Sequence, residues 1–294
     1  MAGLFRRWMD RTKAELISDE RYISRKYRRI VGKELDLHNP QRFTEKIQWL
    51  KLFWRPVILT KCADKIEVQG FVAERTGPEL LKKLYGVYDR VEDIDLQSLP
   101  KAFVLKLNHG CKLNIFCADK SKLDWTRSKS QLREYMKTNH YYSSREWAYK
   151  NIVPRILCEE HLTPNGEDIH EYNFWCFNGK PWFVELAVHG SNCVLRGNMF
   201  DLELNVMERS YGAPPLLELP QKTPKYMDML HCAENLCRDF PFVRVDLFKV
   251  NERFCFGELT FYPYGGIFRF RPAPLDDYFG SILALPGPVT EGDR

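Results

Sequence analysis

The sequence predicts an α+β protein in which a helical, basic N-terminal region precedes a strand-rich C-terminal half. Helix-like periodicity dominates up to about residue 74, and short aromatic and β-branched runs separated by turn signals dominate after residue 171. The 294 residues include 44% apolar and 28% charged side chains, which is ordinary for a globular chain and excludes a disordered one. This length predicts one or two domains.

Positive charge is concentrated near the start of the chain. Residues 1–60 hold fourteen Lys and Arg against seven Asp and Glu, whereas the whole chain has a formal charge of only +5. The segment 4–30 is expected to be helical, with Phe5, Trp8 and Met9 on one face and arginines beside them. Such a helix either packs on the protein or lies on an anionic membrane surface. Nucleic acid is not expected, because no binding motif accompanies the charge.

The sequence also favours a cytoplasmic protein. No apolar run approaches the ~18 residues that span a bilayer, and the first ten residues lack the apolar stretch of a secretory signal. The nine cysteines are an odd number without a CxxC pair, which is typical of free thiols in a reducing compartment. Peripheral attachment at the inner face of the membrane is the alternative that the basic region leaves open.

The first half of the chain predicts helices, one short apolar strand and a second apolar run. Thr44 is expected to cap the first helix, and the second is expected to stop at Gly77-Pro78. The expected elements are helices at 44–52 and 62–74, a strand at 102–107, helix-prone residues at 119–150 and an apolar run at 152–158.

Two hairpins are expected beyond residue 171, with a helix at 226–237 between them. Asn178-Gly179 lies between two aromatic runs and is a strong signal for a two-residue turn, because both turn positions require positive φ. The second hairpin spans 243–260, with Asn251–Arg253 expected as its loop.

The second hairpin is expected to bring two carboxylates together. A three-residue loop pairs Val250 with Phe254, Phe248 with Phe256, Asp246 with Glu258 and Arg244 with Thr260, with all eight side chains on one face. Opposed carboxylates repel at this spacing unless a positive group lies between them. Oxygen ligands suit Mg²⁺ or Mn²⁺, and the alternative is a salt-bridge cluster without metal. A two-residue loop would shift the pairing by one.

A lysine on the apolar strand at 102–107 is a candidate phosphate ligand. Lys106 leads into the polar segment 108–112, which contains a glycine and a second lysine. The charge of Lys106 and the loop amides would suit a phosphate, and a lysine that reaches solvent from a core strand is the alternative.

The order of short motifs resembles the TupA-like ATP-grasp family, named for teichuronopeptide biosynthesis. The resemblance covers roughly residues 40–285. It is carried by EKIQWLKL (45–52), Asp64-Lys65, YGVYD (85–89), LP before FVLKLNHG (99–110), REWAY (145–149), ILCEEHL (156–162), CFNGKP (176–181), RVDLF (244–248) and FGELTFYP (256–263).

The resemblance implies an ATP-grasp fold, in which two α+β lobes grip ATP, preceded here by the basic helical region. The implied divisions are a basic helical N-terminal region at 1–60, a connecting segment at 61–99, a lid lobe at 100–158 and a core lobe with a metal-binding hairpin at 159–290.

The resemblance also implies site residues by position. ATP phosphates would be held by Lys65 and Lys106, with Lys112 as a further contact. The hinge that reads adenine would be Glu159 with the backbone of Glu160 to Leu162, and ribose would be bound by Glu171 rather than Asp168. Catalytic roles fall to Arg244, which would meet the transferred phosphoryl group, and to Lys106, with His109 placed near the active site. Magnesium ligands would be Asp246, Glu258 and Thr260.

Two positions depart from the family pattern. Cys111-Lys112 stands where Ser-Gly is common, and Asn173 stands where a lysine is usual. ATP binding is therefore expected, while turnover depends on whether these positions tolerate the change.

The resemblance favours an ATP- and magnesium-dependent ligase that joins a carboxylate to an amine through an acyl phosphate. Its substrates would be a carboxylate-bearing cell-surface polysaccharide, or its precursor, and an amine. One alternative is a glycosyltransferase, for which Asp93-Ile94-Asp95 would supply a DxD motif. This alternative is disfavoured, because no apolar strand precedes the motif. The other alternative is a protein that binds nucleotide without turnover.

Overall fold

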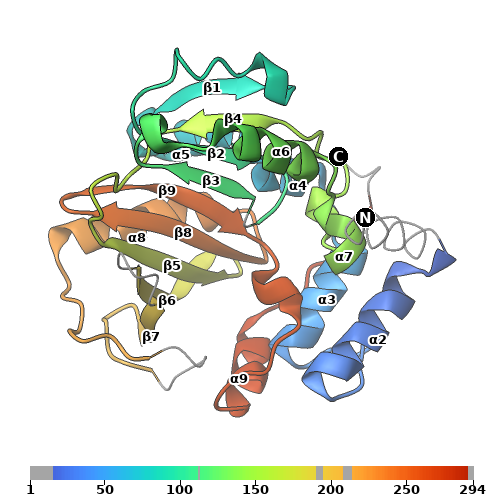
Figure 1. Ribbon diagram of the computed structural model, residues 1–294. Helices are drawn as coiled ribbons and strands as arrows, with labels where there is room; N and C mark the ends of the chain where they lie inside the picture. Colours follow the sequence, from blue (N-terminus) through green and yellow to red (C-terminus); the bar gives the residue numbers. More distant parts are fainter. Residues whose placement is uncertain (1–15, 112, 190–194, 208–213, 291–294) are drawn as a thin grey trace.

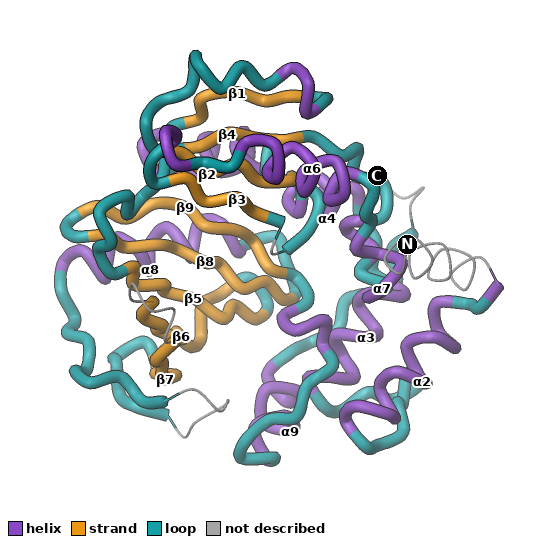
Figure 2. Tube along the Cα trace, in the orientation of Figure 1, coloured by secondary structure: helices purple, strands orange, loops and turns teal. Residues whose placement is uncertain are grey.

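Two antiparallel sheets form the centre of the protein, and helices surround them (Figure 1). The computed structural model describes residues 16–111, 113–189, 195–207 and 214–290. The smaller sheet has the strand order β1-β4-β2-β3, and the larger has the order β7-β6-β5-β8-β9. In Figure 2 the four-stranded sheet lies above the five-stranded one, with β3 and β9 at the edges that meet. This mixture of helices and antiparallel sheets confirms the expected α+β class.

The elements follow one another along the chain in a simple order. The helices are α2 (Asp19–Val31), α3 (Phe43–Phe53), α4 (Val57–Ala63), α5 (Val68–Thr76), α6 (Trp125–Met136), α7 (His140–Ser144), α8 (Pro224–Cys237) and α9 (Pro274–Ile282). The strands are β1 (Leu84–Tyr88), β2 (Phe103–Leu107), β3 (Asn114–Cys117), β4 (Ile156–Glu159), β5 (Ile169–Phe177), β6 (Lys180–His189), β7 (Leu195–Asp201), β8 (Phe242–Val250) and β9 (Arg253–Thr260).

Helix α2 packs on the protein through one face and presents arginines on the other. Ser18 caps its start and Gly32, with φ of 81°, ends it. Ile23 and Tyr27 are fully buried, and the Tyr27 hydroxyl lies 2.8 Å from the Thr44 hydroxyl. The expected apolar face of Phe5, Trp8 and Met9 lies outside the described residues.

The next two expected helices differ from the structure at their starts. Helix α3 begins at Phe43, where Arg42 and Glu45 form a capping box, so Thr44 lies inside the helix and is not its cap. The helix expected at 62–74 is in fact two helices, α4 and α5. The chain breaks between them because the Asp64 carboxylate accepts the backbone N–H of Ile66 at 2.8 Å, which competes with helical hydrogen bonding.

The first hairpin agrees with its sequence signal. Phe177 pairs with Lys180 across the two-residue turn Asn178-Gly179, whose φ values are 52° and 76°. A side chain at Gly179 would lie 2.7 Å from the carbonyl oxygen of Arg238, so glycine is also required sterically.

The second hairpin has a shorter loop than expected and an extra residue in one strand. Val250 pairs with Arg253, so the loop is the two residues Asn251-Glu252, and the pairing expected near the turn is wrong by one residue. The register then shifts between Asp246 and Leu247, where Gly257 forms a β-bulge. Beyond the bulge the expected pairs are present: Asp246 lies opposite Glu258, and Arg244 opposite Thr260. Phe256 is displaced to the face of its partner Leu247, so the eight side chains do not share one face.

Helices cover both faces of the five-stranded sheet. Phe174 packs against Tyr226 of α8, whereas Trp175 packs against Phe43 of α3 and Phe279 of α9. Helices α3 and α9 also bond directly: the backbone N–H of Thr44 donates to Asp276 at 2.9 Å and its hydroxyl donates at 2.8 Å. A separate, smaller core lies between the four-stranded sheet and α6.

Two expectations about the chain concern membranes and thiols. Within the residues that the structure describes, no helix is long and apolar enough to cross a bilayer. The eight cysteines in this part of the chain are all free thiols, as expected.

Candidate functional site

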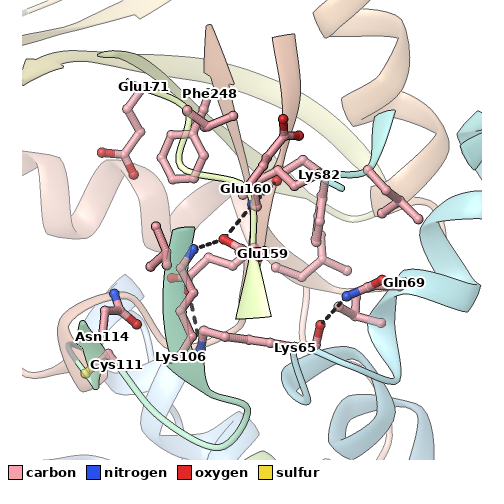
Figure 3. A pocket seen from close by; sticks show the side chains of 18 of the residues that line it. Lys65, Gln69, Lys82, Lys106, Cys111, Asn114, Glu159, Glu160, Glu171 and Phe248 are labelled. Carbon is pink, nitrogen blue, oxygen red and sulfur yellow. Dashed lines mark hydrogen bonds and ion pairs between the residues drawn. The ribbon is translucent and has the colours of Figure 1, made fainter. Parts of the chain in front are cut away.

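A cavity of about 530 Å³ lies between the two sheets. Side chains from both sheets and from helices α4 and α5 line it (Figure 3). Its charged and polar lining residues include Lys65, Gln69, Lys82, Lys106, Asn114, Glu159, Glu160, His161, Glu171 and Glu258. Its apolar lining residues include Val68, Leu81, Val104, Phe116, Leu162, Ile169, Phe248, Phe256 and Leu259. The cavity therefore combines apolar walls with a cluster of lysines and carboxylates.

The lysines in the cavity are held by specific partners. Lys106, on β2, forms an ion pair with Glu159 on the neighbouring strand β4. Lys65 follows α4 and donates to the carbonyl oxygen of Gly110 at 2.7 Å, and its Nζ lies 3.9 Å from Glu258. Burial lowers the pKa of Lys106, and the nearby charge of Lys82 lowers it further.

Hydrogen bonds at Glu160 hold the segment that joins β4 of one sheet to β5 of the other. The Glu160 backbone N–H donates to the carbonyl oxygen of Lys83 at 2.9 Å, and its carboxylate accepts the Lys83 backbone N–H at 2.9 Å. Arg253 donates to both carboxylate oxygens, at 2.8 and 2.6 Å. Burial would raise the pKa of Glu160, but these hydrogen bonds outweigh it and lower that pKa. The hinge expected at 160–162 thus lies beside the cavity in a fixed conformation.

Behind the cavity, the second hairpin gathers an acidic and basic cluster. Arg244 donates to both oxygens of Asp246, each at 2.7 Å. The Thr260 hydroxyl lies 3.2 Å from Asp246 and 3.0 Å from Glu258, so one hydroxyl connects the two carboxylates. Asp246 is 1% exposed, whereas the Glu258 side chain is 39% exposed and lines the cavity.

Electrostatics distinguish these two carboxylates. Burial raises the pKa of Asp246 to about 7; Arg244 opposes the shift, and the nearby carboxylates Glu258 and Glu171 reinforce it. Burial would raise the pKa of Glu258 as well, but Lys65 and Arg244 outweigh it and lower that pKa. Burial would lower the pKa of Arg244, and the Asp246 carboxylate instead raises it.

The donor set of the hairpin fits a hard cation that keeps other ligands. Asp246, Glu258 and Thr260 supply only oxygen atoms, which Mg²⁺ prefers. In the described part of the chain no group of three or more His, Cys, Asp or Glu side chains is placed to hold a metal. Two carboxylates and one hydroxyl are a donor set of the kind that binds Mg²⁺ together with water and phosphate.

The structure brings most of the sequence-predicted site residues to one cavity. Those that line it are Lys65, Lys106, Glu159, Glu160, Leu162, Glu171 and Glu258. Arg244, Asp246 and Thr260 lie behind Glu258 on the same hairpin. Lys112 lies outside the described residues.

His109 is not among the residues that line the cavity. It is 2% exposed, and its ring nitrogens lie 3.2 Å from the Asn108 side chain and 3.0 Å from the carbonyl oxygen of Thr138. Burial lowers its pKa. The ring is thus buried between the segment after β2 and the segment after α6, and a catalytic role for His109 stays a prediction.

Sequence reasoning missed a third lysine and several apolar walls. Lys82 lines the cavity, lies 3.8 Å from Glu159 and donates to the carbonyl oxygen of Phe256. A lysine pair directly before the strand of the YGVYD motif was its only signal. Phe248 was assigned to the hairpin but not to the site.

The positions that depart from the family pattern have different environments. Cys111 lines the cavity and is exposed. Asn173 is 5% exposed and is paired in the sheet with Glu185 on one side and Asp246 on the other. Its Oδ1 atom is buried and has no hydrogen-bond partner among the described residues.

The DxD motif is remote from this chemistry. Asp93 ends a short 3₁₀ turn and pairs with Arg90 at 3.0 Å, and the Asp95 carboxylate accepts the backbone N–H of Gln97 at the same distance. Neither residue lines the cavity. This arrangement does not support the DxD motif as the metal site of a glycosyltransferase.

Comparison with known proteins identifies the family. A family model described as TupA-like ATP-grasp matches residues 45–284. No curated protein matches the chain. Similar solved structures include a D-alanine–D-alanine ligase from Bacillus anthracis complexed with ATP, at 16% identity, covering 74% of this chain and 56% of that chain, with a TM-score of 0.38.

Two further structures have comparable similarity. An L-amino acid ligase from Bacillus licheniformis is 12% identical, with 70% of this chain and 44% of that chain covered and a TM-score of 0.40. The ATP-grasp ligase PsnB, complexed with a precursor variant, Mg and ADP, is 9% identical, with 77% and 60% covered and a TM-score of 0.41. The chain thus spans about half the length of these structures. The match over residues 45–284 shows that the chain belongs to the TupA-like ATP-grasp family.

Proposed function

We propose that the protein is an ATP- and magnesium-dependent ligase that joins a carboxylate to an amine. The observation that carries the proposal is that Lys65, Lys106 and Glu258 line the same cavity between the sheets. The chain that contains this cavity belongs to the ATP-grasp family. The substrates we propose are a cell-surface polysaccharide or its precursor, which supplies the carboxylate, and an amine. The whole reaction rests on family membership and on the chemistry of this cavity.

The two ends of the cavity suit the two ends of ATP. Apolar side chains suit a purine: Val104 and Phe248 come from the two sheets, and Leu162 comes from the segment between β4 and β5. The backbone at 160–162 would read the edge of the base. Glu171 lines the same cavity and would accept hydrogen bonds from ribose hydroxyls. Lys65 and Lys106 would then neutralise phosphate charge in a site of low dielectric constant.

Magnesium would be held by Glu258 and Asp246, with the Thr260 hydroxyl between them. The bound cation would neutralise charge on the ATP phosphates, and Mn²⁺ has the same ligand preference. Arg244 already contacts Asp246, so its guanidinium is fixed beside the place where a transferred phosphoryl group would be stabilised.

The proposed reaction has two steps. A substrate carboxylate oxygen attacks the γ-phosphorus of ATP, the bond to the β,γ-bridging oxygen breaks, and ADP leaves. The amine nitrogen then attacks the acyl carbon, phosphate departs with the former carboxylate oxygen, and the nitrogen loses a proton to give an amide. The four-stranded sheet above the cavity would exclude water, which otherwise hydrolyses the acyl phosphate.

One experiment tests the proposal directly. The protein is incubated with labelled ATP and Mg²⁺, candidate uronic-acid glycans and amino acids, and the products are analysed for ADP and an amide. ATP protection against thermal unfolding should be lost in Lys106→Ala. Release of UDP from a sugar nucleotide would instead indicate a glycosyltransferase, and protection without ADP formation would indicate a nucleotide-binding protein.

We infer further that the basic N-terminal region holds the enzyme at an anionic membrane surface. Arg21, Arg25 and Arg29 are exposed at four-residue spacing on α2, where like charges repel one another. A surface of anionic lipid would relieve this repulsion and attract the helix. This recruitment would bring the cavity close to lipid-linked precursors without taking part in the chemistry.

A further inference from the structure

Glu159 lies between two lysines in the proposed nucleotide cavity (Figure 3). Lys106 forms an ion pair with its Oε1 atom, and the Nζ atom of Lys82 lies 3.8 Å from the same oxygen. The side chain of Glu159 is 8% exposed, as is that of Lys82, and the Lys106 side chain is 15% exposed. One buried carboxylate therefore has two candidate cationic partners, of which Lys106 is the nearer.

The hydrogen bond that holds Lys82 in place leaves its ammonium group able to donate to Glu159. Its Nζ donates to the carbonyl oxygen of Phe256 at 2.6 Å and lies 5.3 Å from the centre of the Phe248 ring. An ammonium group has three donors, so the bond to Phe256 leaves others for a carboxylate. Lys82 comes from the segment before β1, whereas Phe256 and Phe248 belong to the other sheet.

Nucleotide binding creates a difficulty for Glu159. Lys106 must turn toward the phosphates if it is to neutralise them, and it then leaves Glu159. A buried carboxylate that loses its only partner is strongly destabilised, because the low-dielectric interior replaces little of the lost hydration. If no other cation could pair with Glu159, Lys106 would stay in its ion pair with Glu159 and would bind phosphate weakly.

We propose that Lys82 becomes the ion-pair partner of the Glu159 carboxylate when Lys106 moves to the nucleotide. Lys82 is thus a positioning residue that makes Lys106 available, and it does not itself contact the phosphates. The proposal deepens the proposed function and rests on ATP binding in this cavity.

A double-mutant cycle on ATP affinity tests the exchange. ATP dissociation constants are measured by calorimetry for the full chain, Lys82→Met, Glu159→Gln and the double variant. Lys82→Met should raise the Kd for ATP at least tenfold. In the Glu159→Gln background the same change should have less than a threefold effect, because a neutral amide needs no cation. Lys83→Met is the matched control, since Lys83 is the exposed neighbour and should leave the Kd unchanged.

The outcomes separate the exchange from its alternatives. An unchanged Kd in Lys82→Met would overturn the proposal, and an equal loss in both backgrounds would show that Lys82 binds the nucleotide itself. Lys82→Arg, which keeps the charge, should restore most of the affinity, whereas a merely structural role would respond to shape rather than charge. Urea denaturation checks that each variant is folded, and Lys82→Gln replaces Lys82→Met in the cycle if the latter is not. Failure of the unmodified chain to bind ATP would instead refute the proposed function.

Discussion

Asp246 and Glu258 face each other across two strands because a single extra residue, Gly257, is inserted between them and the turn. The two-residue loop alone would place Gly257 opposite Asp246 and turn Glu258 toward the other face. The bulge moves the pairing by one residue and brings the carboxylates back together. The candidate metal site thus depends on a local irregularity of β9.

Substitution of Gly257 should destabilise the hairpin and separate the carboxylates. A Cβ atom at this position would lie 2.7 Å from the carbonyl oxygen of Asp246 and 3.0 Å from the Phe248 ring. Gly257→Ala should therefore lower the free energy of unfolding by ~1–3 kcal/mol in urea titrations and weaken Mg²⁺-dependent ATP binding. Gly70→Ala is the control, because its Cβ would meet nothing within 4 Å in helix α5, and it should stabilise by ~0.5–1 kcal/mol. Equal behaviour of the two variants would contradict the role of the bulge.

The two carboxylates should differ in what their removal does to stability. Asp246→Ala leaves the Arg244 guanidinium, whose side chain is 12% exposed, without its bidentate partner, and should cost ~3–5 kcal/mol. Glu258→Ala removes a partly exposed group and should change the free energy of unfolding by only ~0.5 kcal/mol. Both should abolish Mg²⁺-dependent turnover. Denaturant titrations and ADP release assays on the same preparations check this pair of expectations, and a stable Asp246→Ala variant would argue against it.

As pH rises, ATP affinity should begin to fall at a lower pH than the pKa of an ordinary lysine side chain would predict. Burial, reinforced by Lys82, lowers the pKa of Lys106, so its ammonium group is lost as pH rises through a value below the usual 10.5. The protonated form binds phosphate, so the affinity is complete below this pKa and declines above it. Kd measurements between about pH 7 and 10 test this expectation. Lys106→Arg keeps its charge throughout that range and should give a flatter profile, and identical profiles would exclude Lys106 as the titrating group.

The exposed arginines of α2 should control binding to anionic vesicles. Each Lys or Arg near an anionic surface contributes ~1 kcal/mol, so the double variant Arg21→Gln/Arg25→Gln should bind roughly 30-fold more weakly. The loss should shrink at high salt, because screening shortens the range of attraction. Lys122→Gln/Arg127→Gln removes two exposed charges near α6 and serves as the control. Vesicle co-sedimentation measures both, and equal binding of all three proteins would refute recruitment through α2.

Local signals in the sequence were sufficient for most strands and for the first hairpin. Asn178-Gly179 predicts its turn because few residues tolerate two successive positive φ angles. The apolar run at 102–107 predicts β2 because it is short and is flanked by Pro100 and by a polar segment that contains Gly110, which is typical of a buried strand. The family resemblance then ordered Lys65, Lys106 and the hairpin around one site.

The remaining errors came from interactions that a local pattern does not contain. The break at Asp64 depends on a side chain that competes for backbone N–H groups, and the start of α3 depends on Arg42 and Glu45 acting together. The hairpin prediction combined a loop that was one residue too long with an overlooked bulge, and the two errors cancelled at Asp246. Gly257 was the available signal, because glycine inside a strand often marks a bulge. Lys82 escaped notice because nothing in its neighbourhood shows that it reaches across to β4 and β9.

The packing of α3 against α9 has a consequence for synthesis on the ribosome. Phe43 emerges from the ribosome well before the helix that packs on it, because Asp276 in that helix follows Thr44 by 232 residues. Trp175 packs against both Phe43 and Phe279, so its contact with Phe279 forms only after α9 has been synthesised. The nascent chain must keep this surface from associating with other chains until α9 emerges, so the larger core is completed only after all the strands of the two sheets have been synthesised.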